Sequence, residues 1–426
     1  MDTEISPSAA LVARDAKVFF HQDGSSPCLA GLRAVSGSWI EDLDGRRYLD
    51  LHGNTTHHIG HANPELIAAL KAQLDELTFS PRRYANEPAT ALAELLTGQW
   101  PAGPAKVLFT TGGSDAIEVA MKLARVATGR SATISLEGSY HGHGFGAFGL
   151  SRAIPDARLG SFLPDRVHVR SYWKHGADAM LQDIERALVT TPGGVAALIA
   201  EPIRSNCHVP PAGLWPEVRR LCDAAGTALI FDEIPSGLGK TGKFFAFEHF
   251  GAQPDMVVLG KALGGGHLPI AAVLAGARFD VAPELALGHY THEKNPLTTR
   301  AALTTVSIIL RDELPARAAR LEQLVRARVA GLAASNPWLR SVRGKGLLLA
   351  LELDRAALQH AGEANLLASL LASGISTTTK GDDAIGFSPP LTITEAEIDV
   401  ALTGIGRAVA ELARESLPSA AGQPVT

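Results

Sequence analysis

Between residues 106 and 276 the chain alternates short, continuous apolar runs with longer segments of helical periodicity. A strand that is apolar at every position is buried on both faces, as in a mostly parallel sheet covered by helices. Two helical segments, Ser114–Thr128 and Pro216–Ala225, are each followed by the glycine that is typical of a helix end. This pattern predicts an α/β fold. The apolar runs are Val107–Phe109, Ala197–Ala200, Ala228–Phe231, Met256–Leu259 and Ile270–Ala275.

The texture of the sequence differs on both sides of this region. Residues 1–15 predict a loose arm, and Ser38–Asp50 predicts two short strands about an Asp-Gly turn. After about residue 315 the pattern predicts a helix, then a strand over Gly346–Leu353, and a final helix from Thr392 onward. We therefore expect a large domain over residues 56–315. A small α+β domain would combine residues 1–55 with residues 316–426.

Composition excludes several classes of protein. The 39 Lys and Arg against 44 Asp and Glu give a net charge of −5, without the cationic excess that a nucleic-acid binder needs. Cys28, Cys207 and Cys222 are too widely spaced for a disulfide framework or a zinc ribbon. The start of the chain does not resemble a secretion signal, and no apolar run reaches the roughly 18 residues of a membrane span. We expect a cytoplasmic enzyme that binds neither nucleic acid nor membrane.

The most specific motif is FDEIPSGLGKTGKFFAFEHFGAQPDMVVLGKALGGG, residues 231–266. Asp232 ends one predicted strand, and Lys261 follows the next one. The carboxyl ends of parallel strands are where α/β proteins bind ligands, and a partly desolvated lysine there can form a Schiff base. The GLGKTG segment does not predict a nucleotide-binding loop, because Ile234 stands where that loop requires glycine.

Two further segments point to a phosphorylated, flat ligand. LFTTGGSDAIEVAMK, residues 108–122, predicts a strand, a Gly-Gly turn and a helix whose N-terminus can bind phosphate. SYHGHGFG, residues 139–146, places Tyr140 beside His141 and several glycines. None of the closely spaced histidines has the i,i+4 helical pairing together with a carboxylate that a zinc enzyme shows, so we expect no catalytic metal.

Together these segments resemble the class III aminotransferases, which are pyridoxal-phosphate enzymes of fold type I. The resemblance covers roughly residues 30–410. It implies that Lys261 forms the internal aldimine and moves the proton, while Asp232 pairs with the pyridine nitrogen. It further implies an obligate homodimer, in which a threonine reaches the phosphate of the neighbouring subunit. The other implied cofactor contacts are Gly113 and Ser114 at the phosphate, Tyr140 and Ile234 at the ring, and Thr291 across the dimer.

Four positions depart from the pattern of this family. The phosphate loop contains Gly112-Gly113-Ser114-Asp115 instead of Ser-Gly-Ala/Ser-Glu, and Pro235 replaces a glutamine. Many members bind a substrate carboxylate with an arginine that is paired with an acidic residue. Those two places hold Gly386 and Asn206 here, so we expect this chain not to bind 2-oxoglutarate in that manner. Arg82, Arg83 and Arg204 are the cations that we expect to bind another anion.

Within the family, the segments GNTTHHIGHANP, FSPRRY and YTHEKNP look most like the ammonia-lyases of (R)-1-hydroxy-2-aminoethylphosphonate. This resemblance implies that a primary amine reacts through an external aldimine, and that phosphonoacetaldehyde and ammonia are released. An ω-aminotransferase that uses pyruvate or another oxo acid is the alternative. A catalytically silent protein of the same fold is a third possibility, against which the presence of both Lys261 and Asp232 argues.

Overall fold

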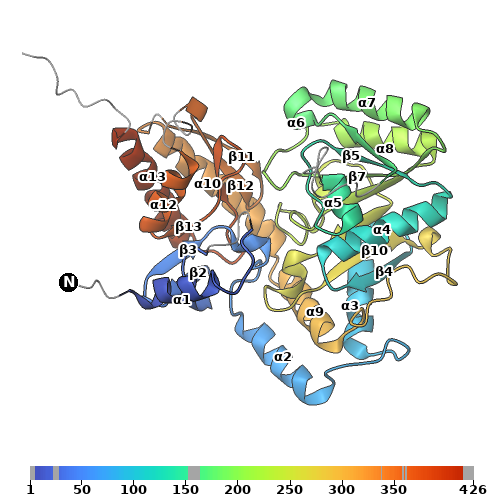
Figure 1. Ribbon diagram of the computed structural model, residues 1–426, viewed down its shortest axis with the longest axis horizontal. Coiled ribbons are helices and arrows are strands. Elements are labelled where there is room, and N and C mark those ends of the chain that lie inside the picture. The colour runs from blue at the N-terminus through green and yellow to red at the C-terminus, as the bar shows by residue number, and fades with distance from the viewer. Residues whose placement is uncertain are drawn as a thin grey trace, which may run out of the picture.

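The computed structural model describes residues 5–415, apart from 23–27, 152–163, 337, 357–358 and 360–361. A seven-stranded sheet forms the core of the larger part of the molecule, on the right in Figure 1, in the order β4-β10-β9-β8-β7-β5-β6. Strands β6, β5, β7, β8 and β9 are mutually parallel, which confirms the expected mostly parallel sheet. The strands are β4 Ala105–Thr110, β5 Ala132–Leu136, β6 Arg166–Val169, β7 Val195–Ala200, β8 Ala228–Asp232, β9 Met256–Leu259 and β10 Ala271–Gly276.

Strand β10 differs from the others in direction. It runs antiparallel to both of its neighbours, pairing Ala272 with Phe109 of β4 and with Leu259 of β9. Its apolar sequence indicated burial on both faces, which the structure confirms, but burial does not determine strand direction.

Helices cover both faces of the sheet, so alternate residues of each strand belong to different cores. In β8, Ile230 packs in the same cluster as Ile117 of α4, whereas Leu229 and Phe231 pack in the cluster that contains Trp215 of α8. Both faces of the sheet are therefore covered, which leaves the ends of its strands as the places where a ligand can bind. The surrounding helices include α3 Glu87–Gly98, α4 Gly113–Thr128, α5 Phe145–Ser151, α6 Tyr172–His175, α7 Ala177–Thr190, α8 Leu214–Ala225 and α9 Pro296–Arg311.

Segments from both ends of the chain come together beside this sheet (Figure 1). Strands β1, β2 and β3 form an antiparallel unit, and β13 adds to β3 in parallel with Ile375 opposite Leu49. We keep the domain boundaries at 55/56 and 315/316 as a proposal. These elements are β1 Leu32–Ser36, β2 Trp39–Asp42, β3 Arg47–Asp50, α10 Leu314–Ala333, β11 Leu339–Lys345, β12 Leu348–Leu353, α12 Glu363–Ala372, β13 Ile375–Ser376, β14 Ala384–Phe387 and α13 Glu395–Glu415.

Two helices near the N-terminus begin at a capping side chain. In α2, Pro64–Glu76, the Asn63 side chain accepts from the N–H groups of Glu65 and Leu66. The expectation of a loose arm over residues 1–15 is wrong for Pro7–Asp15. This segment forms α1, which Ser6 caps by accepting from the Ala9 N–H.

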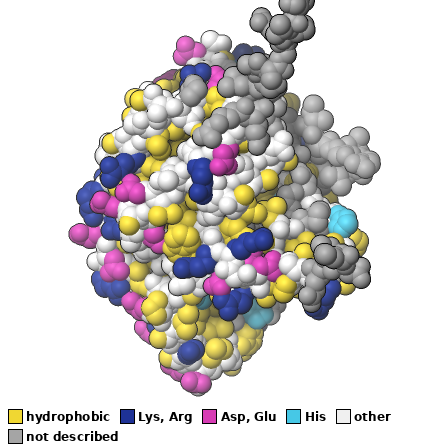
Figure 2. All heavy atoms as spheres, turned by 90° about the vertical axis from the view of Figure 1, so that its left-hand side faces the viewer, with side chains coloured by type: hydrophobic (Ala, Val, Ile, Leu, Met, Phe, Trp, Pro, Cys, Tyr) yellow, Lys and Arg dark blue, Asp and Glu magenta, His cyan; other side chains and the backbone are white. Residues whose placement is uncertain are grey.

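The distribution of surface charge and the character of the helices relate to the expectation that the protein binds neither nucleic acid nor membrane. On the face turned to the viewer in Figure 2, acidic and basic side chains are interspersed among neutral ones. Such a mixture does not produce the one-sided positive field that steers nucleic acid. Among the helices that the structure describes, none combines the length and the apolar character required to cross a membrane.

Candidate active site

A pocket lies at the carboxyl ends of the central strands, where Asp232 ends β8 and Lys261 follows β9. The parallel direction of these strands brings both side chains to the same edge of the sheet. Six of the seven residues that the sequence suggested for the cofactor line this pocket, although they come from distant segments. They are Gly113, Ser114, Tyr140, Asp232, Ile234 and Lys261.

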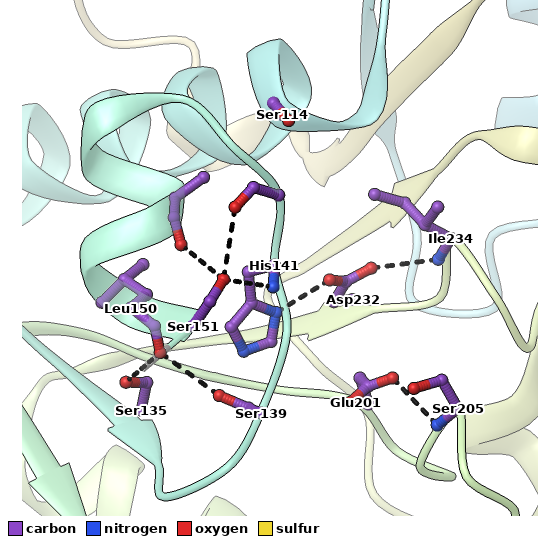
Figure 3. A network of polar contacts seen from close by, with 12 residues as sticks. Ser114, Ser135, Ser139, His141, Leu150, Ser151, Glu201, Ser205, Asp232 and Ile234 are labelled. Atoms are coloured by element: carbon purple, nitrogen blue, oxygen red, sulfur yellow. Dashed lines mark hydrogen bonds and ion pairs between the residues drawn. The ribbon is translucent and has the colours of Figure 1, made fainter. Parts of the chain in front are cut away.

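Asp232 is held by contacts on both carboxylate oxygens. Its Oδ2 lies 2.8 Å from Nδ1 of His141, and its Oδ1 accepts from the Ile234 N–H at 3.1 Å (Figure 3). Asp232 and His141 are both buried, and the His141 backbone N–H donates to Ser151 Oγ at 2.7 Å. The carboxylate therefore has one orientation, and a cationic ring nitrogen is the kind of partner that such a group binds.

Lys261 combines a strained backbone with a perturbed amine. Its φ of 43° lies in the left-handed region, which is unfavourable for a residue with a Cβ and is found at functional sites. Desolvation lowers the pKa of the Lys261 amine, whereas the charges of Asp232 and Glu201 oppose this shift. The charge of Lys380 lowers the pKa further. A larger fraction of the amine is thus uncharged near neutral pH, as a nucleophile or a base requires.

The N-terminus of α4 forms another wall of the pocket. Gly112 caps this helix without a side-chain hydrogen bond, so the first N–H groups remain available to an anion. A Cβ atom at Gly113 would lie 2.7 Å from Cδ1 of Ile234, and one at Gly142 would lie 2.4 Å from Oγ of Ser114. Glycine at these places allows the backbone to approach the pocket closely.

Arg204 lies beside the pocket but is already engaged. Its guanidinium pairs with the carboxylate of Glu201, donates to the carbonyl of Gly138 and lies 4.7 Å from the centre of the Trp173 ring. Burial raises the pKa of the Glu201 carboxyl, but the charges of Arg204 and His141 and the bonds from Ser205 outweigh this and lower it. The positive charge of Arg204 is therefore largely balanced within the wall of the site.

Arg82, Arg83 and Thr291 are exposed and do not line the pocket of their own chain. Arg82 Nη1 donates to the carbonyl of His289 at 3.4 Å, and Asn86 Nδ2 donates to that of Lys294 at 2.9 Å. The two segments that carry these residues thus contact each other, outside the set of residues that lines the pocket with Lys261.

The histidines near residue 57 surround a carboxylate. Nε2 of His61 lies 2.9 Å from Oδ2 of Asp50, and that carboxylate also accepts from the N–H groups of His52 and Gly53. Single ligand atoms of Asp50, His57 and His61 lie within 4.8 Å of one another. Burial raises the pKa of Asp50, yet the bond from His61 and the charge of His57 dominate and hold it at about 2.

Sequence reasoning did not assign a role to Lys380. In the described residues, its side chain lies next to Gly386, and its charge acts on Lys261. The only signal in the sequence was the glycine at position 386, which leaves room that another side chain can occupy. His141 was noted beside Tyr140 but was not connected with Asp232.

The fold is shared with a solved enzyme that holds a cofactor. The taurine:2-oxoglutarate aminotransferase of Bifidobacterium kashiwanohense, solved in complex with PLP and glutamate, matches this chain with a TM-score of 0.87 at 26% identity. The match covers 98% of this chain and 100% of that one. With a lysine and a buried carboxylate at the carboxyl edge of the sheet, the chain is a pyridoxal-phosphate enzyme of fold type I.

The family follows from the sequence comparisons. The family model for class III aminotransferases matches residues 21–409. The (R)-1-hydroxy-2-aminoethylphosphonate ammonia-lyase of Vibrio splendidus is 34% identical over 435 residues, 95% of this chain and 91% of that protein. The acetylornithine aminotransferase of Mycolicibacterium smegmatis is 34% identical over 411 residues, covering 95% and 100%. The chain belongs to the class III aminotransferase family, which confirms the predicted family, fold class and cofactor.

The residues present fit pyridoxal phosphate. An uncapped helix N-terminus suits a phosphate, and the glycines beside Ser114 keep that region clear of side chains. The buried carboxylate of Asp232 suits a protonated ring nitrogen, and Lys261 supplies the amine.

Proposed function

We propose that this enzyme is an ammonia-lyase that converts (R)-1-hydroxy-2-aminoethylphosphonate to phosphonoacetaldehyde and ammonia. The observation that carries the proposal is the missing carboxylate clamp. Gly386 has no side chain, and Asn206, at the place of the acidic partner, is neutral. A dicarboxylate amino acceptor therefore lacks its usual bidentate arginine. The similarity to the enzyme of Vibrio splendidus supports the same reaction.

Each cofactor contact is part of the proposal. Asp232 would hold the ring nitrogen, Gly113 and Ser114 the phosphate, and Tyr140 and Ile234 the ring. Thr291 would reach the site of the partner subunit in a homodimer, which its exposed position outside the pocket supports. Pyridoxal phosphate supplies an electron sink for the negative charge that develops beside the amine nitrogen.

Lys261 would move the proton in this reaction. Its amine, with a lowered pKa, takes a proton from the carbon that bears the nitrogen. Hydroxide leaves from the neighbouring carbon, and a water molecule then releases ammonia and leaves the aldehyde. One water is lost and one is taken up, so the conversion needs no oxidant and no second amino acceptor.

An ω-aminotransferase is the second candidate, because most of the similar proteins named here are aminotransferases. The two reactions differ in stoichiometry. We expect the holoenzyme to release ammonia from (R)-1-hydroxy-2-aminoethylphosphonate, one for each phosphonoacetaldehyde, at a rate that does not depend on pyruvate. Turnover that strictly requires the oxo acid would refute the lyase. Lys261→Ala is the control, and it should abolish both ammonia release and the cofactor band of the resting enzyme.

A further inference from the structure

The space beside Gly386 is occupied by a lysine side chain. A Cβ atom at Gly386, in β14, would lie 3.1 Å from Cε of Lys380 and 3.1 Å from the carbonyl oxygen of Thr378. A side chain at position 386 would therefore have to displace Lys380. The end of Lys380 thus takes the room that a longer residue at 386 would need.

The charge of Lys380 affects the pKa of a residue that lines the pocket. It lowers the pKa of Lys261, and it also lowers the pKa of half-buried His52, for which desolvation is the larger cause. Because an electrostatic effect of this kind falls off with distance, the ammonium of Lys380 lies within electrostatic range of the Lys261 amine.

Among the residues that the structure describes, the ammonium of Lys380 has no counter-charge and no hydrogen-bond partner. The carboxylates nearest along the chain are engaged elsewhere, since Asp383 pairs with Arg343 at 2.9 Å and Asp382 pairs with Arg355. A half-buried cation without a partner is unfavourable on its own and gains from an anionic ligand.

The backbone holds Lys380 in this place. Its N–H donates to the Ala384 carbonyl at 2.8 Å, and its own carbonyl accepts from Arg343 Nη2 at 2.6 Å. Arg343 Nε donates to the carbonyl of Asn206 at 3.2 Å. One partly buried guanidinium therefore ties the Lys380 segment to the loop that follows Glu201 in the wall of the pocket.

We infer that Lys380 binds the anionic group of the substrate, as a single point charge in place of the missing arginine clamp. The identification of that group as a phosphonate rests on the proposed function. An ammonium makes no planar, bidentate contact, so it does not select a carboxylate as arginine does, and it suits the tetrahedral oxygens of a phosphonate.

The test compares Lys380→Met and Lys380→Arg with the wild-type holoenzyme. We expect Lys380→Met to raise KM for (R)-1-hydroxy-2-aminoethylphosphonate by about 10- to 100-fold, as for loss of a charged hydrogen bond. The value of kcat should change much less, the cofactor band should persist, and Lys380→Arg should recover part of the affinity. Lys71→Met, on the exposed side of α2, is the matched control and should leave KM unchanged.

A binding measurement separates this inference from the proposed reaction. 2-Aminoethylphosphonate lacks the hydroxyl group that would leave, so its affinity can be titrated by the change in cofactor absorbance. Tight binding that Lys380→Met weakens at least tenfold supports the inference, even if the wild-type enzyme releases no ammonia and the lyase proposal fails. Equal affinities of wild type and Lys380→Met overturn the inference, even if the wild-type enzyme is a lyase.

Discussion

Nδ1 of His141 lies 2.8 Å from Oδ2 of Asp232, and both side chains are buried. The imidazole is itself enclosed, and within the described residues its Nε2 has no hydrogen-bond partner. The carboxylate is thus oriented by a ring that has little freedom to move. This arrangement leaves the charge of Asp232 available at the end of β8.

Replacing that charge tests its role directly. Asp232→Asn keeps the shape of the side chain and loses a charge-assisted hydrogen bond to the cofactor. We expect the rate at which an added amine changes the cofactor absorbance to fall by about 10- to 100-fold. The measurement is stopped-flow absorbance at saturating pyridoxal phosphate. A rate within twofold of the wild type would show that Asp232 is dispensable.

Gly142 is required by its conformation and by its surroundings. Its φ is 121°, and a Cβ atom there would lie 3.0 Å from Cα of Ser114 as well as 2.4 Å from Oγ. Gly142→Ala should therefore displace the start of α4 and raise the Kd for pyridoxal phosphate by about tenfold or more, for a strain of roughly 1–3 kcal/mol. Gly98→Ala, at the exposed end of α3 where nothing lies within 4 Å, should bind the cofactor normally.

Lys240 is completely buried, and its Nζ donates to the carbonyl of Pro389 at 2.6 Å. Desolvation lowers the pKa of Lys240 from 10.5 to about 7, although the negative charge of Asp50 acts in the opposite direction. Between these two pH values the Lys240 amine is protonated in the unfolded chain but not in the folded protein. The contribution of Lys240 to stability is therefore present at high pH and is lost as the pH falls through about 10 toward 7.

Lys240→Met removes this titration but keeps the volume. We expect the melting temperature of the variant, relative to wild type, to be higher at pH 6.5 than at pH 9, because the linkage between these two pH values amounts to about 2–3 kcal/mol. Thermal unfolding of both holoenzymes at the two pH values gives the comparison. If the melting temperatures of variant and wild type differ by the same amount at pH 6.5 and at pH 9, the lowered pKa of Lys240 is contradicted.

Arg204 and Glu201 form an ion pair in which each charge compensates the other. Arg204→Ala should destabilise the protein by about 3–5 kcal/mol, because it leaves the Glu201 carboxylate buried without its counter-charge. The double variant Arg204→Ala/Glu201→Gln should recover most of this loss. Urea unfolding of the two variants decides between this structural role and one confined to the substrate. In the latter case Arg204→Ala would raise KM with little change in stability.

Local patterns predicted the elements and the pocket residues that lie directly after them. Asp232 and Lys261 could be placed together because each lies at the end of an apolar strand. Lys380 could not be placed from the sequence. Its position depends on the absence of a side chain at Gly386 and on the hydrogen bond from Arg343, which lies in a distant segment of the chain. The ion pair of Arg204 with Glu201 could not be predicted either, because a loop and not a helix of regular spacing brings the two side chains together.

The pairing of β3 with β13 has a consequence for the order of events during synthesis. Leu49 finds its partner Ile375 only after the ribosome has made the entire central sheet, α9, α10 and α12. Until then the edge of β3 carries open N–H and carbonyl groups, which another nascent chain could pair with. Completion of this sheet is therefore a late step, and a chain released early would leave that edge uncovered.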